Sequence, residues 1–376
     1  MQFRDLKAQY EKYKVEIDTA VLNVFAESSF ISGPQVRAFE QRLASYVGVK
    51  HCISCANGTD AMSLVLTAWN IGKGDAVFIP NFTFFATGEV VSFVGATPIF
   101  VDVDPVTFNI DTDKLDSKIQ EVILMKELTP KVIIPVDLFG LLADYEKIEM
   151  IAKKYNLLIL EDAAQGFGAE YKGRKACSFG DVATTSFFPA KPLGCYGDGG
   201  AIFTNNDEMA LLLESLRVHG KGKDKYDNVR IGFNSRLDTV QAAILDVKFT
   251  AFINHELDDV NKVYRKYNNL LSSFVEIPSI PDNYLSCFAQ YTIKLKSQTQ
   301  RDELKTYLEI KGIPTLIYYT KTMHNQTAFR NLDNKDEDYP VSTQLCKTVL
   351  SLPMHPYLTD SEIELISKSI IEFVTK

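Results

Sequence analysis

Short apolar runs on consecutive positions, separated by longer helical patterns, are the feature that most restricts the fold of this 376-residue chain. Consecutive apolar residues indicate strands that are covered on both faces, because a half-exposed strand is apolar only at every second position. Strands of this kind that alternate with helices form a mostly parallel sheet between two helical layers. The sequence therefore predicts an α/β fold. The expected strands are residues 51–56, 76–80, 97–101, 132–138, 157–160, 181–188 and 200–204.

The pattern changes after about Leu245. Residues 247–274 have long helical character, and residues 290–296 alternate as a half-buried strand does. A capping box that runs from Thr359 to Glu362 begins a last amphipathic helix. At roughly 150 residues per domain, the length suits two domains. We predict a large α/β domain at 1–245, which includes an N-terminal helical segment, and a small α+β domain at 246–376.

Charge and composition exclude several kinds of partner. The chain has 40 basic and 48 acidic residues, a formal net charge of −8, and no basic stripe of the kind that binds nucleic acid. Its most apolar stretch, 90–101, is shorter than the ~20 residues that a membrane-spanning helix needs. The N-terminus lacks a signal-peptide core, and six cysteines are too few for a disulfide scaffold. We expect a cytoplasmic protein with neither a nucleic-acid nor a membrane partner.

Metal chemistry has no support in the sequence. Cys52 and Cys55 have the C-x-x-C spacing of redox and half-zinc sites, but the other cysteines form no second pair. The five histidines are scattered and form no H-E-x-x-H motif. We therefore expect Cys52 and Cys55 to be core residues, and we predict no metal site.

The first candidate site is the turn Asn57-Gly58-Thr59-Asp60, which follows a predicted strand and opens a predicted helix. Free amides at the start of a helix bind phosphate well, because the helix dipole adds to their hydrogen bonds. The alternative is a plain Asn N-cap without a ligand, since the turn matches neither the Walker A nor the dinucleotide motif. Both interpretations stay open at this point.

Two further candidates lie where predicted strands end. Asp162 follows the apolar run 157–160, and the carboxyl ends of parallel strands are where α/β proteins place ligands. Its alternative role is an N-cap of the next segment. Lys191 stands between Pro189 and Pro192 in an apolar, glycine-rich turn, where poor solvation would lower its pKa and make it a Schiff-base nucleophile. The alternative is an ordinary surface lysine.

A phosphate turn, a strand-end Asp and a stiffly held Lys, in that order, are what pyridoxal phosphate requires. The chain resembles the sugar aminotransferases of the DegT/DnrJ/EryC1/StrS family over nearly its whole length. Four stretches carry the resemblance: 52–61, 161–165, 186–205 and 232–245. The resemblance implies the fold type I architecture of pyridoxal phosphate enzymes, as in aspartate aminotransferase. It is strongest to members that aminate the 3-keto group of UDP-2-acetamido-hexuronate for bacterial surface polysaccharides.

The same resemblance implies roles for individual cofactor contacts. Lys191 matches the lysine that binds the cofactor covalently, and Asp162 matches the carboxylate that pairs with the pyridine nitrogen. Gln165 would lie beside the phenolic oxygen of the ring, and Phe84 would stack on the ring face. The phosphate contacts would come from Gly58, Thr59 and Ser186.

A shared site between two subunits is also implied. Asn234 matches an asparagine that reaches the phosphate of the other subunit's cofactor, which requires a homodimer. The resemblance implies L-glutamate as the amino donor and a nucleotide-linked keto sugar as the acceptor. Arg236 could bind a sugar carboxylate bidentately, bind the nucleotide phosphates, or pair with a surface acid.

Two positions near the expected substrate pocket depart from the family pattern. Tyr318 and Tyr319, which we expect to contact the substrate, stand where many relatives carry His-Tyr, and Asp137 stands where many carry His. A dTDP- or UDP-linked 3-keto or 4-keto-6-deoxy hexose is therefore an alternative acceptor. A non-catalytic regulator that binds a nucleotide sugar or the cofactor is the alternative from another functional class.

Overall fold

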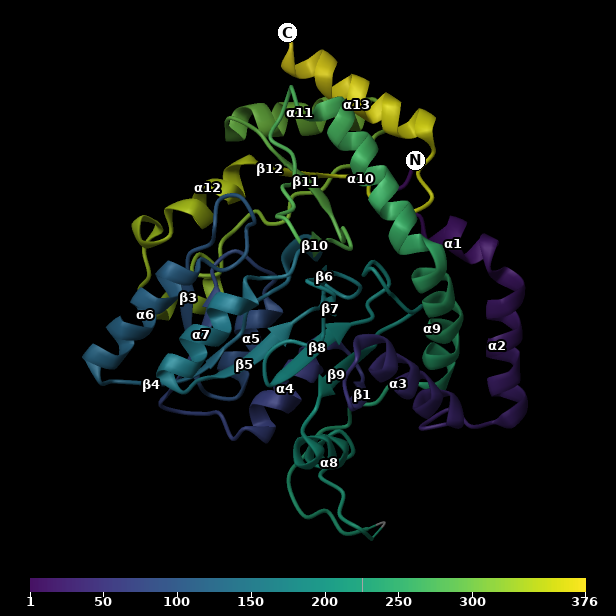
Figure 1. The fold of residues 1–376 in the computed structure, drawn as a ribbon, viewed down its shortest axis with the longest axis vertical. Coiled ribbons are helices and arrows are strands. Elements are labelled where there is room, and N and C mark those ends of the chain that lie inside the picture. The colour runs from purple at the N-terminus through teal and green to yellow at the C-terminus, as the bar shows by residue number, and fades with distance from the viewer. Residues whose placement is uncertain (225) are drawn as a thin grey trace.

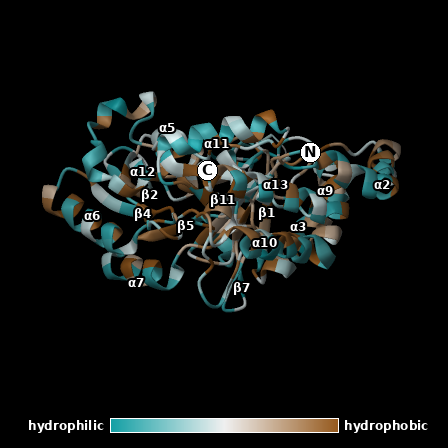
Figure 2. Ribbon diagram, turned by 90° about the horizontal axis from the view of Figure 1, so that it is seen from above, coloured by the Kyte–Doolittle hydropathy of each residue, from teal (hydrophilic) through white to brown (hydrophobic). Residues whose placement is uncertain are grey.

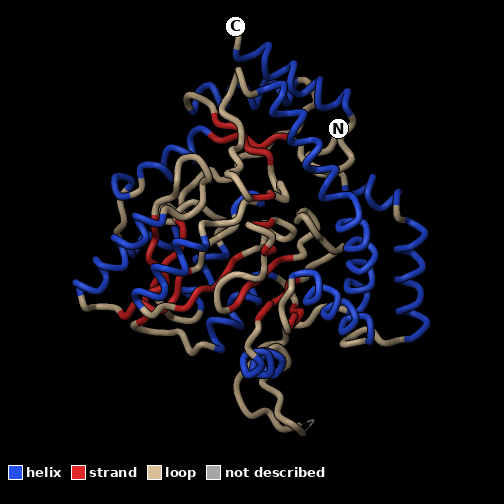
Figure 3. Tube along the Cα trace, in the orientation of Figure 1, coloured by secondary structure: helices blue, strands red, loops and turns tan. Residues whose placement is uncertain are grey.

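A seven-stranded mixed sheet forms the centre of the computed structural model, which describes residues 1–224 and 226–376 (Figures 1 and 3). Its strand order is β1-β9-β8-β5-β4-β2-β3. The run from β8 to β3 is parallel, whereas β9 pairs antiparallel with both β8 and β1. The predicted α/β architecture is confirmed. The strands are β1 His51–Cys55, β2 Asp75–Pro80, β3 Thr97–Val101, β4 Thr129–Ile133, β5 Leu158–Asp162, β8 Val182–Ser186 and β9 Gly200–Thr204.

Helices cover both faces of this sheet, so the strands have to be apolar on consecutive positions. One face carries α3 (Pro34–Val47), α6 (Thr112–Met125), α7 (Tyr145–Tyr155) and α9 (Thr239–Ala251). The other face carries α4 (Gly58–Ala68), α5 (Ala86–Phe93) and α8 (Asp207–Leu216). The hydrophobic colour of the strands in the middle of Figure 2 reflects these two apolar layers.

The expected strands agree with the observed ones within a few residues, with one shortened case. The run 132–138 is a strand only up to Ile133, because Leu138–Gly140 forms a 3-10 turn in which Phe139 has φ 58°. Three strands of two residues each, too short to show a period in the sequence, form a separate sheet in the order β10-β6-β7. They are β6 Glu170–Tyr171, β7 Arg174–Lys175 and β10 Tyr284–Leu285.

A continuous helical rod leads from the sheet to the C-terminal part of the chain. It consists of α9, a π-helical turn at Phe252–Glu256, and α10 (Leu257–Leu271). The second core lies between α10, α11 (Gln298–Ile310), α13 (Asp360–Val374) and the strand pair β11 (Tyr291–Lys294) and β12 (Val349–Leu352). The boundary that we predict near Leu245 falls inside α9, and the division into two domains stays a prediction.

The N-terminal segment joins the sheet to this second part. It runs through α1 (Leu6–Lys12) and α2 (Lys14–Glu27), beside α9 and α10 in Figure 1. The amide of Met354 donates to the Phe3 carbonyl at 3.2 Å, and Gln9 Nε2 donates to the Glu256 carboxylate at 3.1 Å. Within residues 1–224 and 226–376, no helix has the length and apolar character that a membrane crossing requires.

Candidate active site

The turn after β1 has the geometry of an anion-binding cradle as well as that of an N-cap. Asn57 Oδ1 accepts the Asp60 amide at 2.7 Å, so the capping interpretation is correct. The amides of Gly58 and Thr59 donate to no acceptor among the described residues. A Cβ on Gly58 would lie 2.8 Å from the Cβ of Ser186, at the end of β8. Glycine therefore allows two free amides and one hydroxyl to meet at the start of α4.

Asp162 lies at the carboxyl end of β5 and is only 4% exposed. Its Oδ2 accepts the Thr87 hydroxyl at 2.9 Å, and its Oδ1 accepts the Ala164 amide at 3.2 Å. No helix begins after it, so it is not a helix N-cap. Burial raises the pKa of Asp162, whereas these two hydrogen bonds and the charge of Lys191 lower it. Such a carboxylate favours a cationic partner.

Lys191 lies in the turn between β8 and β9, where its amide donates to the Phe188 carbonyl at 2.9 Å. Its side chain is half-buried, so it is not an ordinary surface lysine. Burial lowers the pKa of Lys191; the charge of Asp162 opposes this shift and that of Arg4 adds to it. An amine with a lowered pKa is a better nucleophile at neutral pH. The structure thus brings Asp162 and Lys191 into one site at neighbouring strand ends.

Gln165 and an aromatic wall complete this site. Gln165 Oε1 accepts the Phe139 amide at 2.9 Å, and its Nε2 donates to the Tyr319 hydroxyl at 3.1 Å. Phe84 is 55% exposed, and its ring centroid lies 6.4 Å from that of Tyr319. An exposed Phe beside buried polar groups provides a surface for a flat ring. Tyr318 is also half-buried, with its ring centroid 6.2 Å from that of Phe3.

Asp137 belongs to a buried acidic pair next to the site. Its amide donates to the Asp162 carbonyl at 3.0 Å, and its Oδ1 accepts the Tyr145 hydroxyl at 2.9 Å. Its Oδ2 has no partner among the described residues. Glu161 accepts the Cys177 and Phe179 amides at 2.6 and 2.8 Å. Burial raises the pKa of both carboxyl groups, and this favours a proton on the pair.

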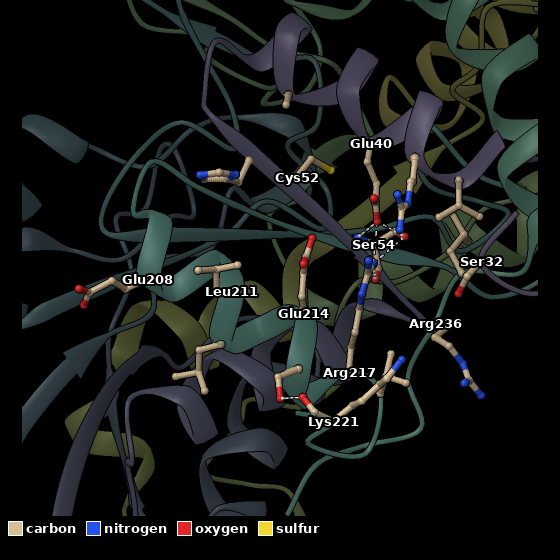
Figure 4. A pocket seen from close by; sticks show the side chains of 18 of the residues that line it. Ser32, Glu40, Cys52, Ser54, Glu208, Leu211, Glu214, Arg217, Lys221 and Arg236 are labelled. Carbon is tan, nitrogen blue, oxygen red and sulfur yellow. Dashed lines mark hydrogen bonds and ion pairs between the residues drawn. The ribbon is translucent and has the colours of Figure 1, made fainter. Parts of the chain in front are cut away.

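Asn234 and Arg236 lie on the segment between α8 and α9. Arg236 lines a cavity of about 1260 Å³, and its side chain points away from the Arg217–Glu40–Ser54 cluster in the middle of Figure 4. It donates to the Asn234 Oδ1. The segment is attached to the phosphate turn, because Ser235 Oγ accepts the Ala56 amide at 3.0 Å. The role that we predict for Asn234 in a partner subunit's site stays a prediction.

Two residues of the site were not predicted from the sequence. Thr87 comes from α5, and Arg4 comes from the N-terminal segment, where its Nη2 donates to the Lys191 carbonyl at 2.7 Å and the Pro192 carbonyl at 3.1 Å. Thr87 lies in the helix that follows β2. Because ligands of α/β proteins bind beyond the carboxyl ends of the strands, the start of that helix was a position that the sequence could have indicated. No local pattern indicates Arg4.

Cys52 and Cys55 are core residues, as predicted, and the other cysteines are buried as well. Those described are buried and unpaired, and burial raises the pKa of Cys52 and Cys55. Among the described part of the chain, no three His, Cys, Asp or Glu side chains are grouped to hold a metal ion.

Residues 11–371 match the model of the DegT/DnrJ/EryC1/StrS aminotransferase family. The chain is 43% identical, over 98% of its length and 99% of the relative, to the UDP-2-acetamido-2-deoxy-3-oxo-D-glucuronate aminotransferase of Pseudomonas aeruginosa. It is 40% identical, over 97% and 96%, to a UDP-N-acetyl-3-dehydro-alpha-D-glucosamine 3-aminotransferase of Acidithiobacillus ferrooxidans. It is 42% identical, over 98% and 97%, to a pleiotropic regulatory protein of Geobacillus stearothermophilus.

Solved structures agree with this match. A DegT DnrJ EryC1 StrS aminotransferase from Brucella abortus aligns over all of both chains, with a TM-score of 0.97 and 48% identity. The structure of ntda from Bacillus subtilis with bound PMP, the amine form of the cofactor, aligns over 100% of this chain and 83% of its own, with a TM-score of 0.87 and 27% identity. The predicted resemblance, fold and cofactor are confirmed. The chain belongs to the DegT/DnrJ/EryC1/StrS aminotransferase family and is a transaminase that depends on pyridoxal phosphate.

Proposed function

We propose that this enzyme transfers the amino group of L-glutamate to the C3 keto carbon of UDP-2-acetamido-2-deoxy-3-oxo-hexuronate. The product would serve bacterial surface polysaccharide synthesis of the O-antigen (lipopolysaccharide) type, in the cytoplasm. The observation that carries the proposal is the meeting of a buried carboxylate, Asp162, and a poorly solvated amine, Lys191, at neighbouring strand ends. The name of the relative from Pseudomonas aeruginosa supports the choice of sugar.

The residues present fit pyridoxal phosphate. The free amides of Gly58 and Thr59 and the hydroxyl of Ser186 would hold its phosphate, and a side chain on Gly58 would fill that space. Asp162 would hold the pyridine nitrogen, and Phe84 would cover one ring face. When bound, the cofactor supplies an electron-withdrawing ring that makes a proton next to the substrate nitrogen removable.

Lys191 performs the proton transfers in this proposal. Burial lowers the pKa of Lys191, which favours the uncharged amine, and only the uncharged amine accepts a proton from the donor carbon. The protonated amine then returns a proton to the acceptor side of the reaction. The hydrogen bonds from Thr87 and the Ala164 amide favour the charged form of Asp162 during these steps.

A homodimer with shared sites is part of the proposal. Asn234 is exposed and would reach the phosphate in the partner subunit, while Arg236 would bind the anionic substrate there. Mixing inactive Lys191→Ala subunits with inactive Asn234→Ala subunits should restore part of the activity, since a mixed dimer has one intact site. Absence of recovery, under conditions in which labelled subunits are seen to exchange, would refute the shared site.

The substrate can be tested directly. Purified enzyme with bound cofactor should absorb visible light, and L-glutamate should convert this band to that of the amine form. Mass spectrometry of a panel of UDP- and dTDP-linked 3-keto and 4-keto sugars, with and without a C6 carboxylate, should show amination of the UDP 3-keto uronate. Preferred amination of a dTDP-linked or 4-keto-6-deoxy sugar would replace the proposed acceptor.

A regulatory function is the second candidate, because one relative is named a pleiotropic regulatory protein. The intact pair of Lys191 and Asp162 argues against a protein that only binds a ligand. Bound cofactor that no amino donor converts, in a protein that still binds UDP-sugars, would favour the regulatory function.

A further inference from the structure

A set of hydrogen bonds at the free edge of the sheet lines the cavity shown in Figure 4. β1 is the edge strand and pairs with β9 alone in the described sheet. In place of a further strand, two side chains satisfy the backbone of Ser54: Glu40 Oε1 accepts its amide at 2.8 Å, and Arg217 Nη1 donates to its carbonyl at 2.6 Å. Arg217 Nη1 also donates to Glu40 Oε1 at 2.6 Å. The end of β1 is thus fixed to α3 and to the residue that follows α8.

The backbone of the same arginine holds the segment that carries Asn234. The Arg217 carbonyl accepts the Ser235 amide at 2.9 Å, and Val218 forms an antiparallel bridge with Asn234. The hydroxyl of Ser235 in turn accepts the Ala56 amide at 3.0 Å. Because Ala56 directly follows β1, this chain of contacts returns to the strand from which it started.

Ser235 is buried, and its hydroxyl is the acceptor for one particular amide. The residue is 0% exposed. The Ala56 amide donates to no other acceptor in residues 1–224 and 226–376. A backbone amide that loses its acceptor in a partly buried place is destabilising. Removal of the Ser235 hydroxyl should therefore loosen the backbone at Ala56.

The two ends of this hydrogen bond lead to two different cofactor contacts. Ala56 leads directly into the turn Asn57-Gly58-Thr59-Asp60, whose free amides would hold the phosphate in the same subunit. Ser235 follows Asn234, which is exposed and would reach the phosphate in the partner subunit. Consecutive side chains of an extended segment point to opposite sides, so the burial of Ser235 directs Asn234 outward.

We propose that Ser235 is a positioning residue for two active sites. Through the Ala56 amide it holds the phosphate turn of its own subunit, and through its burial it directs Asn234 toward the cofactor of the partner subunit. This inference rests on the shared site of the proposed function and goes further, because it gives one hydroxyl an effect on both sites of a dimer. A change at Ser235 in one subunit should weaken cofactor binding in both subunits, whereas a change at Asn234 should weaken it only in the partner.

Heterodimers separate the two effects. One subunit keeps Lys191, and its differently tagged partner carries Lys191→Ala, so only one site of the dimer binds the cofactor covalently. The apo-heterodimer is titrated with pyridoxal phosphate, borohydride fixes the cofactor on Lys191, and intact-mass spectrometry gives the loaded fraction of that subunit. This readout needs neither turnover nor a sugar substrate.

Ser235→Ala is placed either in the subunit that keeps Lys191 or in its Lys191→Ala partner. We expect an affinity about three- to tenfold weaker at the Lys191 site from either position, since one hydrogen bond is lost and its donor is left unpaired. Asn234→Ala should weaken the affinity only from the Lys191→Ala subunit, because that asparagine would serve the site of the partner.

Two further variants distinguish this role from a general loss of structure. Ser235→Cys nearly keeps the side-chain volume and offers a weaker acceptor, so it should give the same pattern without opening a cavity. It carries the test if Ser235→Ala subunits do not fold. Ser367→Ala is the matched control, because Ser367 is 1% exposed on α13 and its hydroxyl has no hydrogen-bond partner among the described residues. This control should leave the affinity unchanged from either position.

The outcomes distinguish a failure of this inference from a failure of the proposed function. If the Ser235 variants weaken binding from one position only, or from neither, while Asn234→Ala acts from the Lys191→Ala subunit, the shared site stands and the role of Ser235 is overturned. If Asn234→Ala does not act from the Lys191→Ala subunit, the shared site fails, and the two-site role of Ser235 fails with it.

Discussion

The Thr87 hydroxyl donates a hydrogen bond to Oδ2 of Asp162 at 2.9 Å, so a helix on one face of the sheet fixes the carboxylate that ends β5. This contact lowers the pKa of Asp162 against the effect of burial. Thr87→Val removes the donor and keeps the shape. We expect pyridoxal phosphate to bind about tenfold more weakly, because a hydrogen bond to a charged group contributes about 1.5 kcal/mol or more. Absorbance titration of apo-enzyme with the cofactor measures this; Ser92→Ala, an exposed change in the same helix, is the control.

The close approach of Gly58 and Ser186 predicts a selective effect of Gly58→Ala. The new Cβ would lie 2.8 Å from the Ser186 Cβ, so the end of β8 has to shift. We expect weaker cofactor binding and a loss of about 1–3 kcal/mol in the free energy of unfolding. Gly72→Ala is the matched control, since its Cβ would meet only the Val94 carbonyl at 3.6 Å. If both variants behave like the wild type, the strand ends are not tightly fixed.

The buried acids Asp137 and Glu161 predict an unusual dependence of stability on pH. Burial raises the pKa of Asp137 to about 7, whereas an unfolded chain has an ordinary carboxyl near 4. Between these values the native state binds more protons than the unfolded state, so this group's contribution to stability falls as pH rises from about 4 to 7.

Asp137→Asn should flatten this dependence. The variant should gain stability relative to the wild type across that window, by at most about 1.4 kcal/mol per pH unit. A smaller slope should remain because Glu161 has a raised pKa for the same reason. Urea unfolding at several pH values checks this, and Asp144→Asn, at the N-cap of α7, serves as a comparison. Parallel curves for wild type and Asp137→Asn would contradict the expectation.

Lys248→Met should stabilise the protein. The native pKa of Lys248 is about 7 and the unfolded value is near 10.4, so the unfolded state binds more protons between them and wild-type stability rises with pH in that range. The gain from Met is therefore largest at or below pH 7 and shrinks by about 1.4 kcal/mol per pH unit up to pH 10. Thermal unfolding measures the gain, with exposed Lys262→Met as control. A variant that is less stable than the wild type at pH 6.5 would contradict this prediction.

The parts of the site that the sequence predicts are those defined by local patterns. Asp162 and Lys191 each follow a recognisable apolar strand, and the Asn57 turn opens a recognisable helix, so their positions at one sheet edge follow from the α/β pattern. The run 132–138 was predicted too long because apolar residues also suit a tight turn: Leu138 and Phe139 are both buried outside a strand.

The remaining parts depend on contacts between distant segments. Arg4 meets Lys191 across 187 positions, and Thr87 meets Asp162 across 75, and neither spacing leaves a trace in a local pattern. The antiparallel direction of β9 is similarly hidden, because a buried strand has the same apolar run in either direction. The family resemblance supplied the roles of Gln165 and Ser186, which composition alone does not distinguish from other polar residues.

The π-helical turn at Phe252–Glu256 sets the rotational phase between two amphipathic helices. Before it, Leu245 and Phe249 face the core under the sheet; after it, Val260, Val263 and Tyr267 face the second core. A π turn contains one residue more than an α turn, and each residue rotates a helix by about 100°. Deleting one residue there would turn the α10 stripe out of its core and move Glu256 away from Gln9. In this rod, the register of a single backbone turn is what lets one helix serve two hydrophobic cores.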